Sequence, residues 1–98
     1  MAYSLSLKAE EDVIDIYAHG ARAFGTSQAE TYFAGLEQAF AFLAEYPRAA
    51  RERREITPPV RVHPFKSHII VYRINGADVR ILRVRHGHED WEPSPAGG

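Results

Sequence analysis

Cysteine is absent from this chain of 98 residues. Its absence excludes disulfide bonds, thiolate metal ligands and cysteine nucleophiles, and it fits a reducing compartment. The chain also lacks the roughly eighteen consecutive apolar residues that a membrane helix needs. Its first residues, MAYSLSLKAEEDV, have neither the basic segment nor the apolar run of a signal peptide. We therefore expect a cytoplasmic protein, neither exported nor inserted into a membrane.

Several enzyme motifs are missing as well. The sequence contains no glycine-rich loop that could cradle a phosphate, and no G-x-S-x-G nucleophile turn. The sequence therefore lacks the characteristic motifs of most classes of small enzyme. We expect no cofactor.

The composition is that of one ordinary folded domain. Hydrophobic residues make up 45% of the chain and charged residues 26%, well away from the composition of disordered segments. A chain this short cannot divide its apolar residues between two stable cores. We expect a single domain over residues 1–98, in which residues 87–98 form a C-terminal tail.

The net charge of −1 conceals a segregated pattern. Residues 1–46 carry seven acidic and two basic groups, residues 47–86 carry three acidic and ten basic groups, and the remainder is acidic. Such segregation creates local potentials that can orient a charged partner. The small net charge therefore excludes neither nucleic acid nor an acidic protein surface as a target.

The first half of the sequence predicts two helices. Ser6 can cap a helix over residues 7–23, whose apolar positions recur at helical spacing. Ser27-Gln28-Ala29-Glu30 has the form of a capping box, and the apolar stripe that follows ends at Pro47. The short connection between the two helices predicts an antiparallel helical hairpin.

The second half predicts strands over residues 60–65, 68–74 and 78–86. Asn75-Gly76 has the composition of a type I′ hairpin turn. The connector before these strands, residues 48–59, is rich in arginine and contains Pro58-Pro59, which forbids regular structure there. With a short strand over residues 3–6, the order is β-α-α-β-β-β. It predicts an α+β fold, with a small antiparallel twisted sheet packed against an N-terminal helical hairpin.

The last predicted strand ends in the segment RVRHGHEDW, which raises a metal hypothesis. His86, His88 and Asp90 alternate along an extended segment and could in principle bind a divalent ion. Gly87 weakens this hypothesis, because it ends the strand and removes the regular spacing. The alternative, surface or hydrogen-bonded histidines and no metal, is favoured.

A second hypothesis is cleavage of a phosphodiester. The arginines could stabilise a pentavalent phosphate and the other groups could act as acid or base. Simple alternation places Arg83 and Arg85 on one side of the last strand but Arg80, Leu82 and Val84 on the other, so no face is wholly basic. The alternative is a solvated cationic surface. The candidates for this chemistry are Arg61, Arg73, Arg83, His63, His68, His86 and Glu55.

Two further features have both a structural interpretation and a partner-binding one. The arginines between Arg48 and Arg54 favour a solvated loop, with an electrostatic contact to acidic protein or nucleic acid as the alternative. Trp91 follows the last strand in a polar context, and it either docks on the core or anchors a partner.

Three segments carry a family resemblance: FGTSQAETYFAGLEQAFAFLAEYP, SHIIVYRI and RVRHGHEDW. Together they resemble the ParE branch of the ParE/RelE superfamily, the toxins of bacterial type II toxin-antitoxin modules. The resemblance spans nearly the whole chain, and the fold that it implies agrees with the fold predicted from periodicity. It implies a growth inhibitor held silent in a hetero-oligomer by a ParD-like antitoxin of ribbon-helix-helix type. Operator DNA would be contacted only through that antitoxin.

The resemblance also implies two possible targets, because ParE members poison DNA gyrase whereas RelE members cut mRNA on the ribosome. RelE-like nucleases commonly show H-R-x-x-x-Y after the last strand. This chain keeps the histidine as His86, but it has Gly87 in place of the arginine and Trp91 in place of the tyrosine. Glycine offers no charge to a transition state, and indole has no hydroxyl group. The departure favours gyrase.

The resulting prediction is a toxin that inhibits by binding, with no catalytic residues. The predicted target surface comprises Arg83, Arg85, His86 and Trp91. The first alternative is a ribosome-dependent endoribonuclease that uses Arg61, Arg73, Arg83 and His86. The second is a degenerate toxin that survives only as an antitoxin-binding partner. The antitoxin is expected across the helical hairpin and along the sheet.

Overall fold

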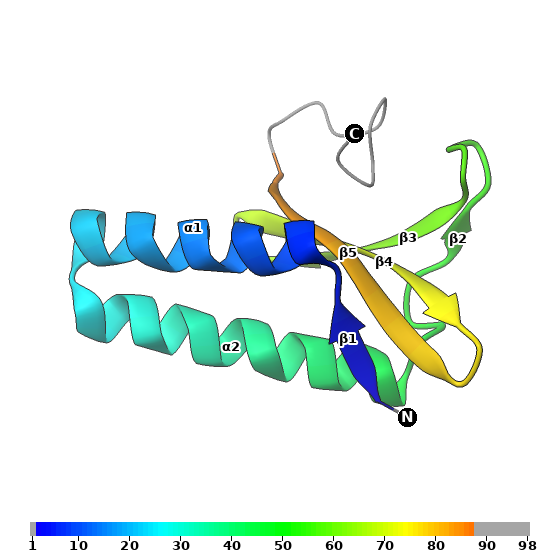
Figure 1. Cartoon of the computed structure of the whole chain (residues 1–98), viewed down its shortest axis with the longest axis horizontal. Helices are drawn as coiled ribbons and strands as arrows, with labels where there is room; N and C mark the ends of the chain where they lie inside the picture. Colours follow the sequence, from blue (N-terminus) through cyan, green and yellow to red (C-terminus); the bar gives the residue numbers. More distant parts are fainter. Residues whose placement is uncertain (1, 88–98) are drawn as a thin grey trace.

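The computed structural model describes residues 2–87 and has two layers, a helical hairpin and a twisted sheet that it covers on one face (Figure 1). The predicted α+β fold is confirmed, and the six predicted elements occur in the predicted order with one further strand among them. The elements are β1 (Tyr3–Leu5), α1 (Leu7–Phe24), α2 (Thr26–Glu45), β2 (Glu52–Arg53), β3 (Val60–Phe65), β4 (His68–Asn75) and β5 (Asp78–His86).

The sheet is mixed, whereas the sequence analysis predicted an antiparallel one. Its strand order is β1-β5-β4-β3-β2, and β1 runs parallel to β5 while the other pairs are antiparallel. The helical hairpin between β1 and the remaining strands provides the long crossover that parallel neighbours require. The connector also contains a short strand that was not predicted, because Glu52 and Arg53 pair with the start of β3.

Local interactions at Ser6 and Gly25 define where the helices begin and end. The Ser6 hydroxyl accepts a hydrogen bond from the Ala9 N–H at 3.0 Å, which confirms the predicted cap. The predicted capping box at Ser27 is wrong, since Ser27 lies inside α2 and no side chain caps this helix. Gly25 joins the helices at a φ of 93°, a backbone conformation that favours glycine.

The β4–β5 turn also differs in its details. Asn75 pairs with Asp78, so the two turn residues are Gly76 and Ala77, and Gly76 alone has a positive φ. Those φ signs belong to a type II′ turn rather than the predicted type I′. Both turns match the right-handed twist of the strands, which explains why the hairpin itself was predictable.

Two apolar clusters lie on opposite faces of the sheet. Leu36, Phe40 and Leu43 of α2 pack with Ile70 and the other helix-facing residues of the strands. Within residues 2–87, the second cluster contains no helical residue, and Ile56 of the connector packs in it. One sheet face therefore remains largely free of helices. The second cluster consists of Ile56, Val60 and Val71, with Val62, Ile69 and Leu82 packed beside them.

Candidate target-contacting surface

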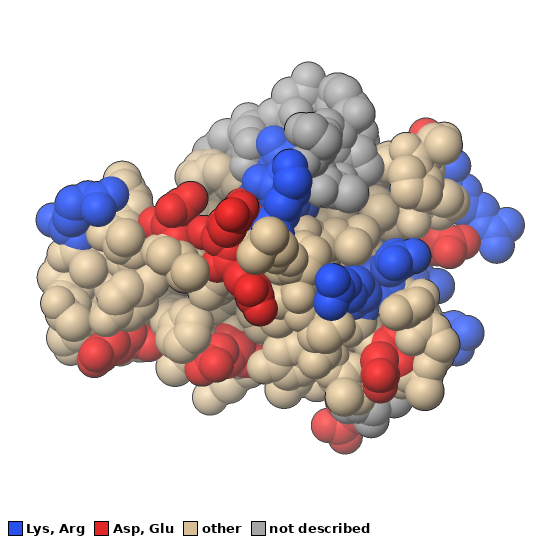
Figure 2. All heavy atoms as spheres, viewed as in Figure 1, with Lys and Arg blue, Asp and Glu red and all other residues tan. Residues whose placement is uncertain are grey.

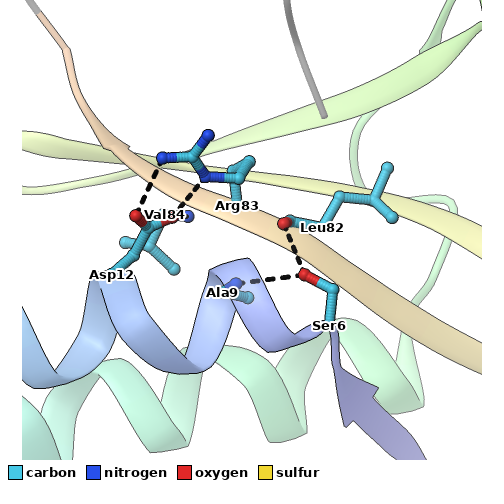
Figure 3. Close-up of polar contacts among 6 residues, drawn as sticks. All are labelled: Ser6, Ala9, Asp12, Leu82, Arg83 and Val84. Carbon is cyan, nitrogen blue, oxygen red and sulfur yellow. Dashed lines mark hydrogen bonds and ion pairs between the residues drawn. The ribbon is translucent and has the colours of Figure 1, made fainter. Parts of the chain in front are cut away.

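The C-terminal half of β5 is fastened to α1 by one carboxylate. Asp12 accepts two hydrogen bonds from the Arg83 guanidinium, at 2.6 Å and 2.9 Å, and a third from the Val84 N–H at 3.0 Å (Figure 3). Because β1 ends at Leu5, no strand within residues 2–87 pairs with β5 on this side beyond Ile81. The Asp12 carboxylate thus takes the place of a missing strand at an open sheet edge.

The first turn of α1 reinforces this attachment. The Ser6 hydroxyl donates a hydrogen bond to the Leu82 carbonyl oxygen at 2.7 Å while it caps the helix (Figure 3). Asp12 and Arg83 are both largely buried, with side chains 14% and 18% exposed. Bidentate pairs of this kind are the strong form of the ion pair. Arg83 therefore has a structural role besides any role in target binding.

A β-bulge at Leu82 changes which side chains share a face. Tyr72 lies opposite Ile81 and Val71 lies opposite Arg83, which leaves Leu82 as the extra residue on β5. Leu82 packs in the helix-free cluster and Val84 in the helix-covered one. Simple alternation, which placed Leu82 and Val84 on the same side, is therefore wrong beyond Ile81.

The bulge gathers arginines on the face without helices. Residues opposite one another in paired strands share a face, so Arg80 lies with Arg73, Arg83 with Val71, and Arg85 with Ile69. Val71 and Ile69 belong to the helix-free cluster. Figure 2 shows basic side chains gathered over β4 and β5. The predicted placement of Arg80 and Arg83 on opposite faces is therefore wrong, although this face also carries apolar residues and is not wholly basic.

Arg61 and Arg73 line a hollow of about 600 Å³ beside the proline-containing connector. Arg61 donates a hydrogen bond to the Ala50 carbonyl oxygen at 2.6 Å, and Arg48 also borders the hollow. Of the described residues that line the hollow, Glu52 alone is acidic, and its pKa is lowered chiefly by its hydrogen bond from Arg54. The hollow is thus lined by cationic and apolar side chains together. The apolar residues are Pro58, Pro59, Val60, Ile74 and Leu82.

The remaining arginines of the connector are held by carboxylates. Arg53 lies 2.7 Å from Glu55, and Arg51 lies 3.5 Å from the same group. The Arg53 hydrogen bond is the main cause of the lowered pKa of Glu55. A carboxylate held ionised by arginines is a poor general base at neutral pH, so Glu55 does not fit the acid-base role considered for it.

Two predicted histidines meet at the other end of the β4–β5 pair. His68 lies opposite His86, with ring centroids 5.4 Å apart. The Tyr32 hydroxyl on α2 lies 2.6 Å from His68 Nδ1, a hydrogen bond that ties the helix to the sheet. Tyr32 was not a candidate from the sequence, because its position in the apolar stripe of α2 predicted core packing.

These histidines border a groove of about 530 Å³ between α1 and α2. Val13 and Ile16 of α1 and Phe33 and Leu36 of α2 give it an apolar lining. The groove lies at a different place from the arginine-lined hollow, and the two share no lining residue. The further residues of the groove are Asp15, Tyr17, His19, Gly20, Phe24, Gln28, Ala29, Tyr32, Ser67, His68 and His86.

The proposed nuclease residues do not form one cluster. Arg61 and Arg73 border the hollow, His86 borders the groove, and Arg83 is bound to Asp12. His63 lies on β3 with its ring centroid 5.7 Å from that of Phe42, and burial lowers its pKa. The strand arginines and the histidines therefore serve different parts of the surface.

Several predictions concern residues outside the described range. Trp91 of the target surface and His88 and Asp90 of the metal hypothesis all lie beyond residue 87. Within residues 2–87, no group of three or more histidine, aspartate and glutamate side chains is placed to hold a metal ion. Neither helix of this range is long and apolar enough to cross a membrane.

Comparison with known proteins assigns the family. A family model described as the ParE toxin of the type II toxin-antitoxin system, parDE, matches residues 3–91. This chain belongs to the ParE toxin family. It is 31% identical to Toxin ParE1 of Caulobacter vibrioides over 84 residues, which are 86% of each chain. It is 33% identical to Toxin ParE1 of Mycobacterium tuberculosis over 89 residues, which are 90% of this chain and 91% of the relative.

A solved structure supports the ParE fold independently. It is titled "Chromosomal ParDE TA system from P. aeruginosa" and has a TM-score of 0.76 to this chain at 22% identity. The match covers 88% of this chain and 95% of the other. The family model and the named relatives confirm the family resemblance in the sequence, and the chain is a toxin of a type II toxin-antitoxin system.

Proposed function

We propose that this ParE toxin inhibits growth by binding and poisoning DNA gyrase in the cytoplasm, without making or breaking a bond itself. Gly87 is the observation that carries this proposal. Its N–H donates a hydrogen bond to the Ser67 carbonyl oxygen at 2.9 Å, and a Cβ at this position would lie 3.3 Å from that oxygen. The backbone at residue 87 is therefore packed closely where a RelE-like nuclease carries its arginine.

The proposed gyrase-binding residues are Arg83, Arg85, His86 and Trp91. The first three come from the end of β5, where β5 lies outside the pairing with β1. Asp12 fixes Arg83 by a bidentate contact, so Arg83 orients this segment as well as adding charge. Preorganised arginine and tryptophan side chains are favoured at binding hot spots.

We further propose that a ribbon-helix-helix antitoxin of ParD type neutralises the toxin by laying a helical segment into the groove between α1 and α2. The apolar lining of the groove suits the helix-in-groove mode. Ile16→Gln, which alters the lining, should weaken antitoxin binding. Ile14→Gln on the same helix is the matched control, because Ile14 is 65% exposed and does not border the groove. Equal binding by both variants would contradict this docking mode.

The order in which cellular processes stop tests the proposed target. Induction of the toxin without its antitoxin should halt DNA synthesis before protein synthesis, because gyrase acts on DNA. Incorporation of labelled thymidine and labelled amino acid, followed together after induction, measures both. Protein synthesis that stops first would support the ribosome-dependent nuclease. Unchanged growth would support the degenerate toxin.

A further inference from the structure

We propose that Arg73 and Arg80 on the helix-free face of the sheet, with Arg48 and Arg61 at the adjoining hollow, bind the phosphate backbone of duplex DNA. The inference deepens the proposed function, on which it rests, because the toxin would contact the DNA held by gyrase as well as the protein. The proposed contact does not depend on the base sequence of the DNA. Operator recognition through the antitoxin is a separate matter.

Arg73 and Arg80 are directly opposite one another on β4 and β5. Like charges in this arrangement destabilise a sheet. Arg80 donates only to a neutral acceptor, the Ser4 hydroxyl at 3.1 Å, and Arg73 is exposed. Within residues 2–87, no carboxylate lies within ion-pair distance of either guanidinium. The fold thus retains two like charges side by side, and a bound external anion would reduce the repulsion between them.

The acidic residues of this region already have partners inside the molecule. Glu52 is paired with Arg54, Glu55 with Arg53, and Asp78 accepts a hydrogen bond from the Ala2 N–H. Internal pairing therefore cancels much of the negative charge between residues 47 and 86. The positive charge outside these pairs includes the four arginines of the proposed surface and Lys66.

Duplex DNA fits this surface better than an acidic protein does. DNA carries one negative charge per about 1.7 Å of helix axis, so neighbouring phosphates can engage Arg73 and Arg80 together. An acidic protein must bring two carboxylates into the same small space at the cost of their own repulsion. Arg61 lies opposite Tyr72, so its position on β3 belongs to the helix-covered face. Its side chain nevertheless lines the hollow together with Arg48 and Arg73, which extends the positive surface toward the connector.

A single-stranded nucleic acid fits less well. Proteins that bind single strands use aromatic side chains on which the bases stack. Among residues 2–87, no aromatic residue lines the hollow. The available chemistry is contact with phosphate, which positions a duplex and carries no base sequence.

Fluorescence anisotropy of the full-length toxin with a labelled duplex, without gyrase, tests the proposal. Four phosphate contacts predict that the affinity falls about 150-fold between 50 mM and 200 mM salt. Arg73→Gln with Arg80→Gln should reduce this ratio to about 12-fold. Lys8→Gln with Arg22→Gln removes the same charge from α1 and should leave the ratio unchanged.

Folding of each variant is checked by thermal unfolding, and removal of a repulsive pair should not unfold the sheet. If the double variant nevertheless fails to fold, Arg48→Gln replaces it, with an expected reduction of about 3.5-fold in the salt ratio. Equal salt ratios for the sheet variant and the control would overturn the proposal. Displacement of the duplex by polyglutamate at equal charge would overturn it as well, in favour of an acidic protein partner.

A gyrase supercoiling assay on the same protein separates this inference from the proposed function. Gyrase inhibition without duplex binding overturns the DNA contact alone. Duplex binding without gyrase inhibition supports the DNA contact and contradicts the proposed function.

Discussion

Asp12 and Arg83 are 71 residues apart in the sequence, yet their side chains form a bidentate contact that joins the first turns of α1 to the end of β5. The same carboxylate accepts the Val84 N–H, so it closes a sheet edge and neutralises a buried cation at once. The segment that we propose to contact gyrase is therefore fixed by the helical hairpin.

Replacing Asp12 should lower stability more than replacing any other acidic residue of α1. Asp12→Asn keeps an oxygen for Val84 but leaves Arg83 without its countercharge, at a cost of about 2 kcal/mol in the free energy of unfolding. Urea denaturation measures the change. Asp15→Asn, one turn further along α1, is the control and should stay within about 0.5 kcal/mol of the parent protein.

Arg85→Gln should separate target binding from folding. Replacement of Arg83 removes the contact with Asp12. A loss of toxicity in that variant could therefore come from lower stability or from a lost contact with the target. Arg85→Gln should reduce growth arrest while antitoxin binding and the unfolding midpoint are retained. Arg22→Gln, an equal change of charge near the end of α1, is the control. Undiminished growth arrest in Arg85→Gln would remove Arg85 from the proposed target surface.

Tyr72 should be sensitive to loss of its hydroxyl group. Its side chain is fully buried, and it donates a hydrogen bond to the Pro47 carbonyl oxygen at 2.8 Å. Burial raises the pKa of Tyr72, so the hydroxyl stays protonated as a donor. Tyr72→Phe should cost about 1 kcal/mol in the free energy of unfolding, because the Pro47 carbonyl loses its partner. A neutral effect in denaturation would contradict this contribution of the hydroxyl group.

His63 should make stability fall as the solution becomes acidic. Burial holds the pKa of His63 below its ordinary value of 6.5, so the unfolded chain binds more protons than the folded chain near and below that pH. Its contribution to stability is present above the unfolded pKa and is lost as the pH falls. Between about pH 7.5 and 5.5, the urea midpoint of His63→Gln should therefore fall less than that of the parent protein. Equal falls would contradict the burial of this imidazole.

The elements of the fold were predictable because their causes are local. The Ser6 cap, the apolar stripe of α2 and the glycine of the β4–β5 turn each act over a few residues. The parallel pairing of β1 with β5 was not predicted, since it depends on where the helical hairpin returns the chain. The capping box at Ser27 failed because Gly25 makes the turn by itself.

The site was less predictable than the fold, and one residue explains much of the difference. The bulge at Leu82 shifts the alternation of β5, and no feature of the sequence marks it. In a regular strand without the bulge, Arg80 and Arg83 would lie on opposite faces of the sheet. The role of Asp12 was hidden for another reason, because an acidic residue near the start of a helix is commonly explained by the helix dipole.

A gyrase supercoiling assay with purified toxin tests the central claim most directly, with ribosome-bound mRNA as a parallel substrate. We predict that the toxin inhibits supercoiling or accumulates cleaved DNA, that the antitoxin reverses the effect, and that the mRNA stays intact. Cleavage of the mRNA with normal supercoiling would contradict the account.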